Sequence, residues 1–121
     1  MHQTLKSQLK AVKAAQRNQQ KTQALAKKIS VLQLVHNRNS KPGQPKDRAV
    51  QEFTKPQMRR DLIDIIWPVL KDQPIVKTTG YSRRALTHDK EVLTAVRHDV
   101  VAAVNLMLPQ LEAELNQRKE A

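Results

Sequence analysis

The first 46 residues of the chain carry positive charge with no negative charge to balance it. They contain ten Lys or Arg and no Asp or Glu, and the first carboxylate is Asp47. From Asp47 onward twelve basic residues face eleven acidic ones, so +10 of the formal net charge of +11 lies before residue 47. This segregation predicts a cationic segment on a nearly neutral body, and the usual partner of such a segment is a polyanion.

The composition of the cationic segment favours a helix. Residues 1–35 contain no Pro or Gly and are rich in Ala, Gln, Lys and Leu, which are good helix formers. At about 100° per residue, six of the cations fall on one side of that helix: Lys6, Lys10, Lys13, Arg17, Lys21 and Lys28. Lys27 lies at the edge of this row. Such a row would follow a phosphate backbone, because each cation displaces a condensed counterion. Glu, which usually pairs with Lys on a solvated helix, is absent here.

The apolar residues of the same segment do not form one continuous seam. Leu5, Leu9 and Val12 flank the cations on one side, and a second group flanks them on the other: Leu25, Ile29 and Leu32. The stretch 16–23 between the two groups has no large apolar residue, which argues against a coiled coil. Either the helix is interrupted there, or its halves pack on different surfaces. We prefer the second alternative, because Gln and Lys do not break helices.

Proline and glycine mark the boundary of this segment. Residues 39–46 read Asn-Ser-Lys-Pro-Gly-Gln-Pro-Lys, which indicates a turn or linker. We therefore expect a basic helical arm over 1–38, a linker over 39–46 and a small helical domain over 47–121. A body of this size buries only a modest core, so homo-oligomerisation stays open.

Composition also bears on the compartment. The chain has no Cys, which excludes disulfides and cysteine-based zinc sites and fits a reducing cytosol. We expect a cytoplasmic protein, with the nucleoid or a host cytoplasm as alternatives. No apolar run is long enough to span a bilayer, and the arm has no Trp or Phe to anchor it in one, so we expect no membrane partner.

Two amphipathic helices are expected to build the body. The first runs from about Lys55 to Leu70, with Thr54 as its cap, Pro56 in its first turn and Pro68 near its end. Its predicted apolar face is Met58, Leu62, Ile65 and Val69 with Ile66 beside it. The second runs from Thr87 or His88 to about Lys119, with a core stripe of Leu93, Val96, Val100, Val104, Met107, Leu111 and Leu115.

The segments around these helices are shorter. Residues 47–54 predict a short helix. Residues 75–79 have the composition of a strand but no second strand to pair with, so we expect a loop, an edge, or half of a strand pairing between chains. Ser82 can cap one helical turn that follows it. The fold class is therefore mainly α: a long basic N-terminal helix, a Pro/Gly joint and a small helical body with two main amphipathic helices.

Four arginines of the body are candidates for a second basic patch: Arg59, Arg60, Arg83 and Arg84. For the last two, ordinary surface charge and a phosphate contact are equally good interpretations. Only three aromatic residues are present, which disfavours modules that read single strands by stacking bases. Contacts with phosphates or with duplex shape are favoured instead.

Catalysis is disfavoured by the same inspection. Asp61 and Asp64 lack a convincing third ligand for a metal-dependent nuclease, and the four His do not show the spacing of a helical metal site. With two glycines in the chain, a Gly-rich phosphate loop is excluded. We expect no enzyme activity, no metal and no cofactor.

One stretch resembles a known family. Trp67-Pro68-Val69-Leu70, then Pro74, Gly80 and the basic run to Leu86, is similar to the opening of the ProQ/FinO family of RNA chaperones, in which a basic N-terminal helix also precedes the domain. The resemblance covers about 20 residues and implies binding of structured or antisense RNA. The Leu-Arg-Arg-Ala-Leu helix and the Tyr-rich segment found later in that family have no counterpart in 90–121.

These observations lead to one expectation and two alternatives. We expect a non-enzymatic nucleic-acid-binding protein, regulatory or architectural, that contacts phosphates through its basic N-terminal helix. DNA and RNA both remain open. The alternatives are an RNA chaperone of the ProQ/FinO type and a helical scaffold or inhibitor that docks an acidic protein partner through the arm. In the second alternative both apolar groups of the arm would face the partner: Leu5, Leu9, Val12, Leu25, Ile29 and Leu32.

Overall fold

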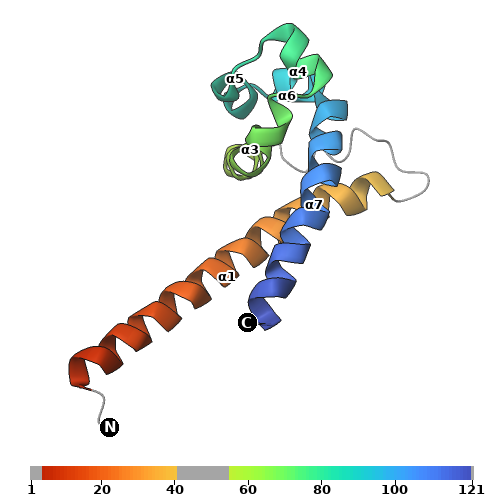
Figure 1. Ribbon diagram of the computed structural model, residues 1–121. Helices are drawn as coiled ribbons and strands as arrows, with labels where there is room; N and C mark the ends of the chain where they lie inside the picture. The colour runs from red at the N-terminus through yellow and green to blue at the C-terminus, as the bar shows by residue number, and fades with distance from the viewer. Residues whose placement is uncertain (1–3, 41–54, 121) are drawn as a thin grey trace.

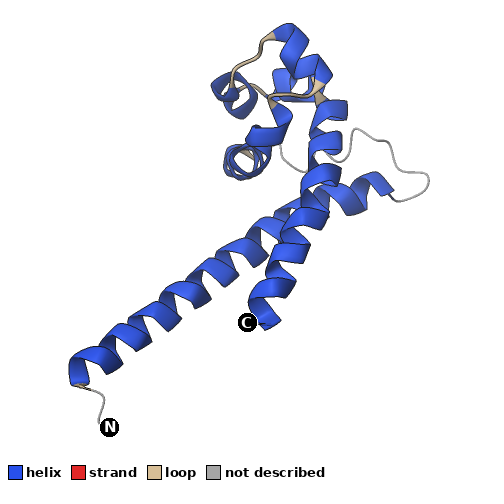
Figure 2. Cartoon of the chain, in the orientation of Figure 1, coloured by secondary structure: helices blue, strands red, loops and turns tan. Residues whose placement is uncertain are grey.

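Helices dominate the part of the chain that this computed structural model describes, which is residues 4–40 and 55–120 (Figure 1). In chain order they are α1 (Leu5–Ser40), α3 (Pro56–Leu70), α4 (Pro74–Thr79), α5 (Arg83–His88), α6 (Lys90–Ala95) and α7 (Arg97–Glu120). No strand occurs within the described ranges (Figure 2). The prediction of a mainly α protein is confirmed. The short helix expected over 47–54 and linker residues 41–46 lie outside the described residues.

The first helix is continuous over 36 residues, a length of about 54 Å at about 1.5 Å per residue. It passes through 16–23 without a break, which excludes the alternative of an interrupted helix. Its halves differ in burial: Leu25 and Leu32 are in the core, whereas Leu5 is 73% exposed. The first turns of α1 extend beyond the other helices, and its second half is crossed by α7 (Figure 1).

The core forms where the second half of α1 meets α3 and α7. Its most completely buried side chains come from all three helices and from the short helices beyond them: Leu32, Val35, Leu62, Ile63, Ile66, Leu70, Leu86, Leu93, Val96 and Val104. α5 packs on α3, and α4 contacts α7. The second half of α1 therefore belongs to the same core as the residues that follow Lys55.

Helix α3 follows its predicted bounds closely. Pro56 is at its first position, and the helix continues through Pro68 to Leu70. Lys55 holds the N-cap position and makes no capping hydrogen bond with its side chain, so the prediction of Thr54 as the cap was wrong. The buried face is Leu62, Ile63, Ile66 and Leu70, whereas the predicted face members Met58, Ile65 and Val69 are half-buried. This shift arises because α3 is covered from two directions, by α5 and by α7.

The strand-like segment is a helix, so the expectation of a loop or edge over 75–79 was wrong. Pro74 starts α4, and Gly80 ends it with φ 73°, a left-handed conformation that Gly adopts readily. Its N-terminal turn is tied to α7, since the Val76 amide donates to Asp99 Oδ2 at 2.8 Å. Asp99 is 5% exposed. The proline, the glycine and this buried acceptor together outweigh the β-branched composition.

The single helix expected from residue 87 to 119 is divided, which corrects that prediction. Ser82 caps α5 as expected, accepting from the Ala85 amide at 3.1 Å. Asp89 then caps a separate helix, α6, accepting from the Glu91 amide at 2.9 Å. Val96, with φ −106° and ψ 23°, separates α6 from α7. The interruption lies among buried apolar residues, and no proline or glycine is present there to predict it.

The predicted core stripe along α7 is confirmed. Val100 and Val104 are buried, and Met107, Leu111 and Leu115 pack against the core from a half-buried position. The described helices include none that is long and apolar enough to cross a membrane.

Candidate nucleic-acid interface

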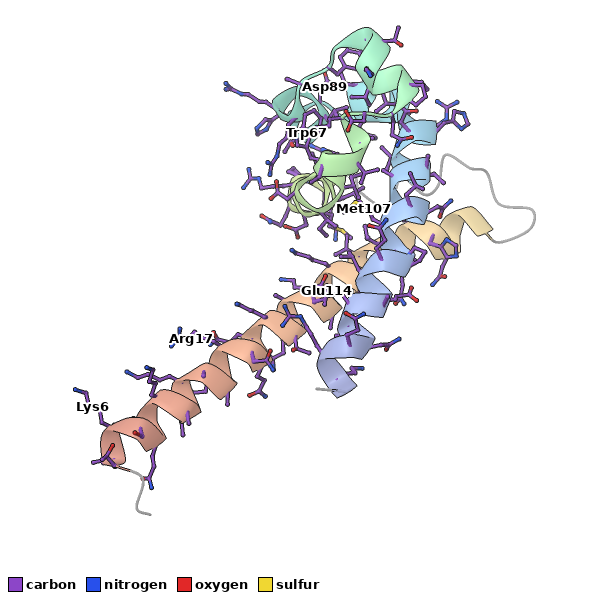
Figure 3. The ribbon with its side chains drawn as sticks, in the orientation of Figure 1. Lys6, Arg17, Trp67, Asp89, Met107 and Glu114 are labelled. Atoms are coloured by element: carbon purple, nitrogen blue, oxygen red, sulfur yellow. The ribbon has the colours of Figure 1, made fainter. Side chains whose placement is uncertain are left out.

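Five cations lie exposed along the projecting half of α1: Lys6, Lys10, Lys13, Arg17 and Lys21. We call this set the basic strip. Its spacing of four, three, four and four residues keeps the side chains on one side of the helix. Lys6 and Arg17 extend from the same side of the projecting half in Figure 3. The axial distance from Lys6 to Lys21 is about 22 Å, at about 1.5 Å per residue.

The basic strip has no internal counter-charge. No ion pair or hydrogen bond joins its five side chains to another residue that the structure describes. Two carboxylates of the body form ion pairs with other residues, Asp64 with Arg83 and Glu114 with Arg118. The first turn of α1 has no acidic residue either, so the positive end of the helix dipole adds to the field of the lysines. These amines are available to an external anion.

Lys27 and Lys28 stand in a different environment. They line a groove of about 250 Å³ between α1 and α3, together with Asp61 and Asp64. Both lysines are exposed and neither makes an ion pair with these carboxylates. The negative charges in the same groove nonetheless offset their potential at an external phosphate. Asp64 contributes less than Asp61 because it also pairs with Arg83. Lys27 and Lys28 therefore differ from the basic strip in sharing a groove with carboxylates of α3.

The arginines proposed for a second patch are not equivalent. Arg59 is 8% exposed, and its Nε donates to the Thr87 carbonyl oxygen at 3.3 Å, so it helps to hold α3 against α5. Arg83 pairs with Asp64. Arg60 and Arg84 are exposed. We therefore leave Arg59 out of the candidate interface, because its guanidinium is already used inside the protein.

One cation that the sequence analysis did not single out lies beside the strip. Arg118, near the end of α7, donates from a terminal guanidinium nitrogen to Asn18 Oδ1 at 3.2 Å. The two residues are 100 positions apart in the chain. No local pattern connects them, so only the packing of α7 on α1 reveals this contact.

No family model, curated protein or solved structure matched the chain. Within the described residues, no three His, Asp or Glu side chains gather in a way that would hold a metal ion. The pronounced chemical feature of the described surface is the basic strip on α1.

Proposed function

We propose that this chain is a non-enzymatic nucleic-acid-binding protein that lays the basic strip of α1 along a phosphate backbone. The helical body anchors α1 through its second half, and the strip projects from that anchor. Nucleic acid is the polyanion best suited to a straight row of cations, because its phosphates repeat along a line. Affinity in such a complex comes chiefly from counterion release.

The observation that carries this proposal is the exposure of five cations with no partner among the described residues. Lysines four apart on a helix repel one another by about 0.2–0.5 kcal/mol per pair. Residues 4–40 contain no carboxylate that would relieve this repulsion. A helix that keeps an uncompensated row of this kind is well suited to an anion from outside.

Binding should be measured by fluorescence anisotropy with labelled duplex DNA, structured RNA and single strands at several salt concentrations. With five to seven phosphates engaged on a duplex, the slope of log K against log salt is expected near −4 to −6. A slope near zero for the full chain would remove the proposal. A clear preference for structured RNA over duplex DNA would favour the ProQ/FinO-like alternative.

The control should remove charge and leave the fold intact. Deleting residues 1–38 would also delete core side chains such as Leu25 and Leu32. Replacing the five strip cations with Gln avoids this, because all five are exposed and Gln is a good helix former. This variant should keep its helical circular dichroism and lose most of its salt-dependent affinity.

A second candidate function has its own observation. Leu5, Leu9 and Val12 are 73%, 53% and 53% exposed on the projecting half of α1. They recur at the four- and three-residue spacing of a helix-docking face, and lysines flank them. The matching occupant is an amphipathic helix with an apolar face and acidic flanks, because its carboxylates would pair with those lysines.

A synthetic peptide tests this second candidate. A helical peptide with Leu at a and d positions and Glu at e and g positions should bind the wild-type chain. Replacing Leu5, Leu9 and Val12 with Gln should abolish peptide binding and leave the salt slope on duplex DNA unchanged. If these substitutions weaken the nucleic-acid complex and the peptide does not bind, the docking face has no separate role.

A further inference from the structure

A groove between α1 and the last turns of α7 gathers positive charge from both helices. Its volume is about 400 Å³, which falls in the range of ligand clefts. The lining residues are Lys10, Ala14, Arg17, Asn18 and Lys21 from α1 and Arg118 from α7. We call it the α1–α7 groove. It holds four cations and, among the described residues that line it, no carboxylate. One of the four, Arg118, pairs with Glu114 of α7 at 3.6 Å.

The three α1 cations of this groove are a subset of the basic strip. Lys10, Arg17 and Lys21 are seven and four residues apart, so they lie almost directly above one another on the helix. From α7, the described lining residue is Arg118. Lys6 and Lys13 do not line the groove.

Arg118 is held in place before any ligand arrives. One terminal guanidinium nitrogen donates to Asn18 Oδ1 at 3.2 Å, and Nε lies 3.6 Å from Glu114 Oε1. The side chain is 30% exposed. A guanidinium has five N–H donors, so donors remain for a ligand. An arginine fixed in this way loses little conformational freedom when it binds an oxyanion.

We propose that the α1–α7 groove binds a phosphate group, with Arg118 donating to its oxygens from α7 and the three aligned cations adding positive potential from α1. Arg recognises the oxygens of a phosphate through paired N–H groups. The source of this phosphate as a nucleic-acid backbone rests on the proposed function. Free phosphate esters share the same chemistry and are separated by the experiment below.

The test compares full-length variants that change charge inside and outside the groove. Arg118→Gln removes the guanidinium that is proposed to donate to the phosphate oxygens. Lys119→Gln removes one charge from the next residue, which is exposed and does not line the groove. Asn18→Ala keeps the charge but removes the acceptor that positions Arg118. Each variant is titrated with inorganic pyrophosphate by calorimetry and with labelled duplex DNA by anisotropy, after circular dichroism has verified its helix content.

Arg118→Gln is expected to weaken pyrophosphate binding about tenfold or more, as for loss of a charged hydrogen-bond donor. It should also reduce the salt slope on DNA by about 1. Asn18→Ala should weaken pyrophosphate binding to a smaller degree, and Lys119→Gln should leave it unchanged. Equal effects of Arg118→Gln and Lys119→Gln would overturn the groove as a site.

The two proposals fail in different ways. If the wild-type chain binds DNA with a steep salt slope but Arg118→Gln behaves like Lys119→Gln, the groove proposal is overturned and the proposed function stands. If the wild-type chain does not bind DNA but binds pyrophosphate in a way that depends on Arg118, the groove is supported with a free phosphate ester as its ligand. The groove proposal is also overturned if the wild-type chain does not bind pyrophosphate and Arg118→Gln leaves the salt slope on duplex DNA unchanged.

Discussion

Two double substitutions on α1 remove the same charge from different surroundings and should affect binding unequally. Lys6→Gln with Lys13→Gln removes two cations from the open part of the basic strip. Lys27→Gln with Lys28→Gln removes two cations from the groove that also holds Asp61 and Asp64. All four lysines are exposed, so neither pair should alter the fold. The net charge falls by two in both variants.

The expected difference follows from the number of phosphates engaged. With the five strip cations engaged, the slope on duplex DNA is about −4.5, since each phosphate contact contributes about −0.9. The first double substitution leaves three contacts and a slope of about −2.7. Raising salt from about 50 to 200 mM should then weaken wild-type binding about 500-fold and the variant about 40-fold. The second double substitution should stay close to the wild-type slope.

Anisotropy titrations of a short labelled duplex at four or five salt concentrations measure these slopes directly. Comparing slopes avoids uncertainty in the absolute affinity, and the equal loss of net charge controls for long-range attraction. Equal slopes for the two variants would refute the reasoning. They would mean that Asp61 and Asp64 do not offset Lys27 and Lys28, and that the interface extends over the whole helix.

Three further predictions concern stability, measured as the free energy of unfolding in urea. Leu32→Ala should cost about 2–5 kcal/mol because the side chain is fully buried. Leu5→Ala on the same helix should cost almost nothing. Similar losses for the two substitutions would contradict the burial described for α1. Asp99→Ala removes the acceptor of the Val76 amide and should cost about 1–3 kcal/mol; the argument fails if Asp99→Asn, which keeps an acceptor oxygen, costs as much. Gly80→Ala should cost about 1–2 kcal/mol through backbone strain. A steric clash does not contribute, since an added Cβ would meet no atom within 4 Å. An unchanged stability would show that the turn relaxes.

Local patterns predicted the parts of this fold that depend on nearby residues. The spacing of Lys6 to Lys21 and the absence of helix breakers determined the charged face of α1. Pro56 marked the start of α3, and Ser82 marked the start of α5. Each of these features acts within one or two turns of the chain, so it can be read without knowing the tertiary structure.

The features that were missed depend on contacts between distant residues. Residues 75–79 have strand composition, but Asp99 supplies an acceptor for the first turn of α4 from 23 positions away. The packing of α7 on α1 is likewise needed for the contact between Asn18 and Arg118. The packing of α3 on α1 is needed for the groove that Lys28 shares with Asp61. The break at Val96 has no local marker. These interactions modify the candidate interface most, which is why the sequence outlined the row of cations but not its limits.

The continuity of α1 has a consequence for how the charged half stays ordered. An isolated helix must overcome a nucleation constant of about 0.001, and short helices in water are marginal. Here the turns around Leu25 and Leu32 are already fixed by packing, so the charged turns need only propagate from a formed nucleus. Mutual repulsion of the lysines should make the free end fray first. Amide protection against hydrogen exchange should therefore decline from Leu25 toward Leu5, and a bound polyanion should restore it.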